Sequence, residues 1–138
     1  MLDENTKTAV IDASFMLSYL MPDERVHETE NIIRQFEKQQ LLLFSTPVFP
    51  MEVLNAVRMA VVRKRINHEN SKKIAELFLK IDIELLSVDY QEAYSLALSN
   101  ELTLYDASYL EVALRRKSAL LTLDSRLEKA FNTYYENV

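Results

Sequence analysis

Short apolar segments rich in leucine and β-branched residues alternate with longer amphipathic segments along the whole chain. This alternation is typical of α/β folds, in which a mainly parallel sheet is covered by helices. The segment 41–44 is apolar without a break, which indicates a strand buried on both faces. The expected strands are 7–11, 41–45, 83–88 and 119–123. The expected helices are 13–20, 25–39, 47–64, 69–81, 90–99, 105–117 and 124–131, and residues 133–138 form either a short edge strand or a frayed end.

The chain contains neither glycine nor cysteine. Phosphate-cradling loops and dinucleotide-binding fingerprints depend on glycine, so both classes of site are excluded. Disulfides, thiolate zinc sites and cysteine nucleophiles are excluded by the lack of cysteine. Helices must also use another residue for the left-handed conformation at their C-terminal ends, and asparagine tolerates it best. We expect Asn67, Asn100 and Asn132, which follow helical segments, to take this role.

The composition is that of one soluble domain. The 138 residues, 49% of them hydrophobic and 27% charged, can form a substantial core, and no linker or repeat divides 1–138. No apolar run approaches the roughly 18–20 residues of a membrane span, and the polar segment 1–5 does not resemble a signal peptide. We therefore expect a cytoplasmic protein without membrane association. The net charge of -5 does not exclude a nucleic-acid substrate, because local basic patches govern contact with phosphate.

Four acidic residues lie in segments that a folded protein tends to bury. Two follow expected strands, one stands at the start of an expected helix, and one lies in a mostly apolar segment; they are Asp12, Asp124, Asp106 and Glu52, in that order. An isolated buried carboxylate is costly, and the sequence places no obvious cationic residue beside any of the four. A divalent cation would compensate the charges if they converge. The pattern therefore predicts a metal-dependent phosphodiesterase.

Two of these acids fall where an α/β sheet binds ligands. Ligands of open α/β sheets bind beyond the carboxyl ends of the strands, where the strand order reverses. Asp12 and Asp124 stand at such ends, so they lie side by side if their strands are neighbours. Carboxylate oxygens suit Mg²⁺ or Mn²⁺, which activate water and stabilise the leaving oxygen in phosphodiester cleavage. Each aspartate is equally well explained as a helix N-cap, whereas the apolar neighbours of Glu52 make a structural role harder to find.

Short motifs surround the four acids. They are Val10-Ile11-Asp12-Ala13-Ser14, Glu52-Val53-Leu54-Asn55-Ala56, Tyr105-Asp106-Ala107-Ser108-Tyr109-Leu110 and Leu121-Thr122-Leu123-Asp124-Ser125-Arg126-Leu127. Each motif is weak alone, but together they span nearly the whole chain in an order and spacing that resemble the PIN-domain nucleases. Within these nucleases, the chain is most similar to the VapC-type toxins of toxin–antitoxin pairs.

The resemblance implies a three-layer α/β/α sandwich around a mainly parallel sheet, with single-stranded or structured RNA as the substrate. The metal-binding acids of the family correspond to Asp12, Glu52, Asp106 and Asp124, with Mg²⁺ or Mn²⁺ as the cofactor. A homodimer and an inhibitory antitoxin that reaches into the active site are implied as well. The lack of glycine departs from most relatives and affects loop shapes rather than the acids. The expected function is a metal-dependent endoribonuclease that serves as a type II toxin.

Other functions remain open. An aspartate-based phosphohydrolase would use Asp12 as its nucleophile, but such enzymes carry a second Asp two residues later, where this chain has Ser14. A PIN-family RNase with a housekeeping role in RNA processing would have the same site chemistry as a toxin. A catalytically silent relative that serves as a binding module would be expected to lack one of the acids, and none is lost.

Polar residues near the acids are candidates for a supporting role. Ser14 is expected to bond a metal-bound water or a phosphate, or only to begin helix 13–20. Thr122 is expected to orient the carboxylate of Asp124, or to be present for its β-propensity.

Two further polar residues lie on the helices that carry the other acids. Asn55, at i+3 from Glu52, lies on the same helix face and is expected to hydrogen-bond to it. Glu111 lies about 140° round the helix from Asp106, so we expect it in solvent or at an interface rather than in the site.

Three features have two explanations each. Helix 47–64, apolar on more than one face, either contributes to a homodimer surface or packs centrally between neighbours. The basic clusters 63–65 and 115–117 either complement the helix dipole or contact the RNA backbone. Three tyrosines either stack on bases or lie at the edge of the core: Tyr19, Tyr105 and Tyr109.

Overall fold

The centre of the fold is a parallel sheet of four strands, seen in a computed structural model that describes residues 7–135. The strands are β1 (Thr8–Ile11), β2 (Leu42–Ser45), β3 (Glu84–Leu85) and β4 (Ala119–Leu121), in the spatial order β3-β2-β1-β4. The helices are α1 (Ala13–Leu20), α2 (His27–Glu37), α3 (Phe49–Val62), α4 (His68–Lys80), α5 (Tyr90–Asn100), α6 (Leu104–Arg116) and α7 (Ser125–Tyr135). Every expected strand and helix is therefore found within the described residues.

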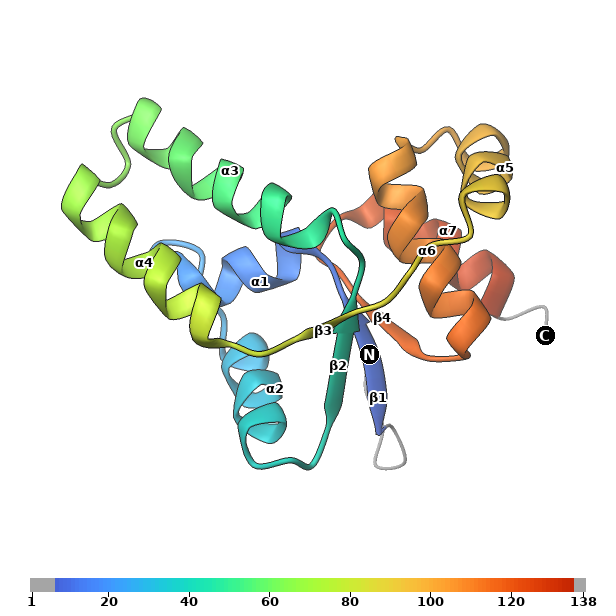
Figure 1. Cartoon of the computed structure of the whole chain (residues 1–138), viewed down its shortest axis with the longest axis horizontal. Coiled ribbons are helices and arrows are strands. Elements are labelled where there is room, and N and C mark those ends of the chain that lie inside the picture. The colour runs from blue at the N-terminus through green and yellow to red at the C-terminus, as the bar shows by residue number, and fades with distance from the viewer. Residues whose placement is uncertain (1–6, 136–138) are drawn as a thin grey trace.

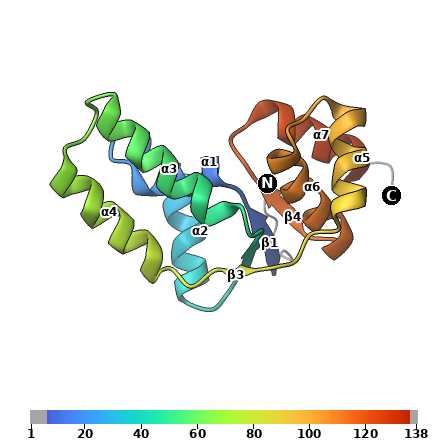
Figure 2. The same ribbon diagram turned by 45° about the horizontal axis from the view of Figure 1, so that its top comes forward.

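Helices cover both faces of the sheet. Figure 1 shows α1 to α4 on one side of the strands and α5 to α7 on the other, and the turned view in Figure 2 keeps the same two groups apart. The core follows this division, since the central strand β1 is fully buried from Ala9 to Ile11 between the two helix layers. The expected three-layer α/β/α sandwich with a parallel sheet is confirmed.

The strand order reverses between β1 and β4. β1 pairs with β2 on one edge and with β4 on the other, in a register that places Ile11 opposite Leu121. The ladder continues one residue further, because the Asp12 N–H donates to the Leu121 carbonyl at 3.1 Å. On the other side, the Ser45 hydroxyl donates to the Ile11 carbonyl at 2.6 Å. The carboxyl ends of three strands are thus joined at the point where α/β sheets bind ligands.

Helix α3 packs between α1 and α4, as the central-helix explanation requires (Figure 1). Its residues Val53, Val57 and Ala60 are buried, while Met51 and Val62 stay exposed. At the end of the chain, α7 continues through Tyr135, so residues 133–135 are helical rather than an edge strand. Residues 136–138 lie outside the described part. None of the helices in residues 7–135 combines the length and apolar character needed to cross a membrane.

Four of the helices in residues 7–135, α2, α3, α5 and α6, are followed by a residue in the left-handed conformation, but not by the asparagines that we expected. The residues with positive φ are Gln39, Lys64, Glu101 and Lys117, with φ between 53° and 61°. Each is followed by a residue whose N–H returns to a carbonyl five positions back, as Arg65 N–H does to Ala60 at 2.8 Å. This is the Schellman pattern, in which glycine normally occupies the left-handed position.

The asparagines have other roles. Asn67 is the N-cap of α4, where its side chain accepts from the Asn70 N–H at 2.7 Å. Asn100 is the last helical residue of α5 and donates to the Leu96 carbonyl and the Tyr134 hydroxyl. Asn132 lies inside α7. The short asparagine side chain contributes most where it replaces a missing helix hydrogen bond, so it is used at a helix start instead of in a strained backbone position.

We predict that Glu101→Gly and Lys117→Gly each stabilise the protein by about 0.5–1 kcal/mol, because a Cβ atom is unfavourable at positive φ. The free energy of unfolding, measured by urea denaturation, would show the gain. Ser99→Gly, at an exposed helical position of α5, is the matched control and should lower stability. An equal decrease in the free energy of unfolding in all three variants would contradict the prediction.

Candidate active site

Asp12 is held by hydrogen bonds from three groups at the carboxyl end of β1. It is 3% exposed. Its Oδ1 accepts from the Ser14 hydroxyl at 2.7 Å and the Phe15 N–H at 2.9 Å, and its Oδ2 accepts from the Thr122 hydroxyl at 2.5 Å. The Phe15 bond makes Asp12 the N-cap of α1. The structural explanation for this residue is therefore correct, and it leaves the carboxylate available for a second role.

Burial raises the pKa of Asp12 from 3.8 to about 6. The three hydrogen bonds oppose this shift, and the negative charge of Asp106 adds to it. A raised pKa means that the folded protein keeps the charged form at a cost in stability.

Thr122 connects Asp12 to the loop that follows β4. Its hydroxyl donates to Asp12 and accepts from the Asp124 N–H at 3.0 Å. Thr122 therefore orients the carboxylate of Asp12, and not that of Asp124 as we expected. The physical reason is register: β4 ends at Leu121, two residues earlier than predicted, so Thr122 stands level with Asp12.

Ser14 has a similar double contact. Its hydroxyl donates to Asp12 and accepts from the Leu123 N–H at 2.9 Å. Ser14 thus lies in the first turn of α1 and, at the same time, fixes the loop after β4 beside the Asp12 carboxylate.

Asp106 and Asp124 stand at two helix starts. Asp124 Oδ1 accepts from the N–H groups of Arg126 and Leu127 at 2.9 and 3.2 Å, which caps α7. The Asp106 N–H donates to the hydroxyl of Thr103, the N-cap of α6. Burial raises the pKa of Asp106, and the charge of Asp124 raises it further, while Thr103 and Arg126 lower it.

Glu52, in the first turn of α3, is bound by Tyr109 from the opposite helix layer. The buried Tyr109 hydroxyl donates to Glu52 Oε1 at 2.6 Å. Burial raises the pKa of Glu52, the Tyr109 bond lowers it, and the charge of Asp106 raises it. The sequence singled out Tyr109 only as a residue that stacks on bases or lies at the core edge, and its bond to Glu52 was not expected. Its position three residues after Asp106, on the same face of α6, is the signal that would have pointed to it.

Asn55 does not take the predicted role. It lines the same groove as Glu52, which confirms the shared helix face. Its side chain is exposed, and no hydrogen bond between it and Glu52 is found in the part of the chain that the structure describes. The amide of Asn55 is open to solvent, while the carboxylate of Glu52 is bound by Tyr109.

The four carboxylates interact electrostatically, and Asp106 takes part in each of the three pairwise interactions. The charge of Asp106 raises the pKa of both Asp12 and Glu52, and that of Asp124 raises the pKa of Asp106. None of the ion pairs within residues 7–135 includes any of the four. Arg126 acts on Asp106 only as a charge that lowers its pKa. The site is therefore a region of negative potential that favours a cation.

The donor atoms fit a hydrated Mg²⁺ or Mn²⁺. Within residues 7–135, no three acidic or histidine side chains converge closely enough to enclose one ion. Mg²⁺ does not require such a cage, because it keeps several waters and is usually held by one or two carboxylates together with substrate phosphates. Asp12 and Asp106 supply oxygen ligands of this kind, and the chain lacks the thiolates that zinc sites commonly use.

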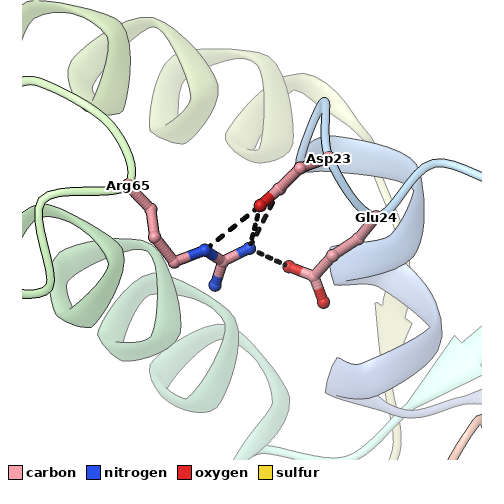
Figure 3. A network of polar contacts seen from close by, with 3 residues as sticks. All are labelled: Asp23, Glu24 and Arg65. Carbon is pink, nitrogen blue, oxygen red and sulfur yellow. Dashed lines mark hydrogen bonds and ion pairs between the residues drawn. The ribbon is translucent and has the colours of Figure 1, made fainter.

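A groove of about 360 Å³ opens beside Glu52 between α1 and α3. Its apolar lining includes Leu17, Met21 and Met59, and charged side chains stand at one end. There, Arg65 forms ion pairs with Asp23 at 2.8 Å and Glu24 at 2.9 Å, as Figure 3 shows. The loop after α1 is thus tied to the turn after α3.

The second basic cluster is also part of the structure. Glu111 is buried, contrary to expectation, because the segment before α5 covers it. Its carboxylate accepts from the Asp89 N–H at 2.6 Å and from Arg115 Nε at 2.8 Å, and Arg115 in turn donates to the Ser87 carbonyl. Arg116 lies over the ring of Phe44. Arg115 and Arg116 therefore support the fold at the end of α6.

Comparison with known proteins agrees with this architecture. Ribonuclease VapC3 of Pyrobaculum aerophilum is 25% identical over 122 residues, which cover 88% of this chain and 93% of that protein. The crystal structure of PAE2754 from Pyrobaculum aerophilum superposes with a TM-score of 0.71 at 19% identity, covering 95% of this chain and 88% of the other. Mycobacterium tuberculosis VapC20, a sarcin–ricin loop cleaving toxin, has a TM-score of 0.58 at 12% identity and coverages of 88% and 94%.

The four motifs that surround the acids fall within residues 9–131, and this stretch matches the model of the PIN domain. The resemblance found in the sequence is thus confirmed over nearly the whole described chain. The chain belongs to the PIN-domain family.

Proposed function

We propose that the protein is a Mg²⁺- or Mn²⁺-dependent endoribonuclease and the toxin of a type II toxin–antitoxin pair, acting in the cytoplasm. The observation that carries this proposal is the group of charge-coupled carboxylates at the strand-order reversal, which no ion pair within the described residues neutralises. The ribonuclease and toxin functions named for VapC3 and VapC20 support it.

The acidic residues would bind the metal ion, and neighbouring hydroxyl groups keep them in position. Asp12, Asp106, Asp124 and Glu52 would form the metal site: one or two of them would bind the ion directly, and the others would act through its bound waters. The bound ion would supply Lewis-acid chemistry, lowering the pKa of water and stabilising the leaving oxygen of the phosphodiester. Ser14 and Thr122 keep both oxygens of Asp12 in place, and Tyr109 does the same for one oxygen of Glu52. Because the pKa values of Asp12, Glu52 and Asp106 are raised, these three carboxylates accept a proton from the attacking water more readily than ordinary ones.

The groove beside Glu52 is the place where we expect the antitoxin to bind. Its apolar lining suits the hydrophobic side chains of a partner segment, and Glu52 at its edge offers an anion to a basic residue of that segment. A segment bound along the groove would reach the acidic cluster and block access of RNA.

We propose that the protein forms a homodimer through α5. Three large side chains spaced four residues apart, Tyr90, Tyr94 and Leu98, form an exposed stripe on this helix. The neighbouring exposed residues Gln91 and Ser95 are uncharged, so the same surface of a second copy can pack against it without repulsion.

Asp12→Asn is predicted to abolish RNase activity and to raise stability above pH 6. The pKa of Asp12 is about 6 in the folded protein and ordinarily 3.8, so the folded state binds the proton more tightly. The contribution of Asp12 to the free energy of unfolding therefore falls as the pH rises from about 4 to 6, by up to about 3 kcal/mol, whereas the asparagine does not titrate. The advantage of the variant should fade below pH 4. Thermal unfolding across pH and cleavage of labelled RNA with Mg²⁺ measure the two effects.

Asp82→Asn is the matched control, since Asp82 is an exposed acid outside the site. It should retain activity and show no comparable pH-dependent gain in stability. Undiminished cleavage by the wild-type protein in excess EDTA would refute metal dependence.

Induced expression of the protein in bacteria is predicted to arrest growth, and Asp106→Asn should remove the arrest at equal protein levels. Co-expression of a short open reading frame adjacent to the gene should restore growth, because its product would cover the site. Growth rate after induction measures both effects. Normal growth with a protein that cleaves RNA in vitro would instead identify a housekeeping RNase.

Leu98→Glu is predicted to convert the dimer into a monomer, because it places like charges opposite each other in a symmetric interface. Light scattering after size-exclusion chromatography measures the mass. Leu79→Glu, on α4, is the control, since Leu79 is 65% exposed and Leu98 is 67% exposed. A dimer that persists with Leu98→Glu would exclude α5 as the interface.

A further inference from the structure

Exposure separates the three tyrosines considered from the sequence. Tyr109 is buried with its hydroxyl on Glu52. Tyr19 is partly buried against the core, and the Arg25 guanidinium lies 5.3 Å from the centre of its ring. Tyr105 is 59% exposed. Within residues 7–135, the ring and hydroxyl of Tyr105 have no hydrogen-bond or aromatic partner. A position at the edge of the core therefore does not account for Tyr105.

The backbone of Tyr105 is nevertheless firmly held. The Ser108 hydroxyl donates to the Tyr105 carbonyl at 2.6 Å and also contacts the Thr46 hydroxyl at 3.1 Å. One residue further on, the Asp106 N–H is bound by Thr103. An exposed aromatic side chain is therefore carried on a rigid first turn of α6, directly before a candidate metal ligand.

Other exposed apolar side chains lie next to the same acids. Leu104 precedes Tyr105, and Leu123 directly precedes Asp124. The N–H of Leu123 is held by Ser14, the residue that also positions Asp12. Arg126, whose charge lowers the pKa of Asp106, adds a cation to this side of the site. Groups that suit a phosphate and groups that suit a base are thus carried by the same two segments, the start of α6 and the loop between β4 and α7.

We infer that Tyr105 is a base-stacking residue that favours RNA with an unpaired nucleotide next to the cleaved phosphodiester; the inference rests on the proposed RNase function. A base in a duplex is already stacked on its neighbours, whereas an unpaired base can leave the strand and lie on an aromatic ring. Stacking tolerates different bases because every base has a π-face. Tyr105 therefore favours unpaired segments over duplexes without fixing the base sequence.

The chain contains no tryptophan, so Tyr105→Trp introduces a single tryptophan, which can be excited without the tyrosines, at the predicted contact. We expect its emission to be quenched by a single-stranded oligoribonucleotide when the probe is combined with Asp12→Asn to prevent cleavage. A duplex of the same length, or polyphosphate of similar charge, should cause much less quenching. Tyr135→Trp is the matched control, because Tyr135 is equally exposed at 59% but lies at the far end of α7.

Kinetics provide a second measurement. Tyr105→Ala should raise KM for single-stranded RNA about 5- to 100-fold with little change in kcat, and Tyr105→Phe should retain the wild-type KM, since stacking needs the ring and not the hydroxyl. An unchanged melting temperature for Tyr105→Ala would show that the rise in KM does not result from unfolding.

Three results would overturn the inference while leaving the proposed function intact. The first is an RNA-cleaving enzyme whose Tyr105→Trp emission does not respond to RNA. The second is equal quenching by RNA and polyphosphate, and the third is an equal rise in KM in Tyr105→Phe and Tyr105→Ala. Absence of RNA cleavage by the wild-type protein with Mg²⁺ or Mn²⁺ would refute both.

Discussion

The buried carboxylate of Asp12 is the contact on which the rest of the site depends. It receives hydrogen bonds from Ser14, the Phe15 N–H and Thr122, and so joins the start of α1 to the loop after β4. Its own N–H extends the β1–β4 ladder. One residue therefore joins β1, α1 and the loop after β4 at the point where the strand order reverses, and it also sets the geometry of the candidate active site.

This arrangement concentrates negative charge on partly buried carboxylates, which lowers the stability of the folded state. Asp106 interacts unfavourably with Asp12 and Glu52, and Asp124 interacts unfavourably with Asp106. The charge of Arg126 offsets part of this at Asp106, but the ion pairs of the described residues lie elsewhere, at Arg25, Arg65 and Arg115. The site thus keeps carboxylates that have no ion-pair partner within the described residues. Active sites commonly combine perturbed carboxylates in this way.

Local patterns predicted most of the fold, and long-range register accounts for what they missed. The alternating apolar segments gave each strand and helix to within a few residues, and the four acids stood out by their apolar surroundings. The partner of Thr122 was assigned incorrectly because β4 ends two residues early, which no local signal shows. The Tyr109–Glu52 bond joins residues 57 positions apart, and the burial of Glu111 depends on the segment before α5. Such contacts arise only when the layers assemble.

The ion pairs of Arg65 with Asp23 and Glu24 have a consequence for measurements on the groove. Both acids and the arginine are substantially solvent-exposed, so their attraction is screened as ionic strength increases. At 1 M salt the screening length falls to about 3 Å, close to the length of the contacts themselves. The electrostatic part of the tie between the loop after α1 and the turn after α3 is then weakened, and the hydrogen bonds of Arg65 remain. Binding constants for this groove are therefore expected to depend on the ionic strength at which they are measured.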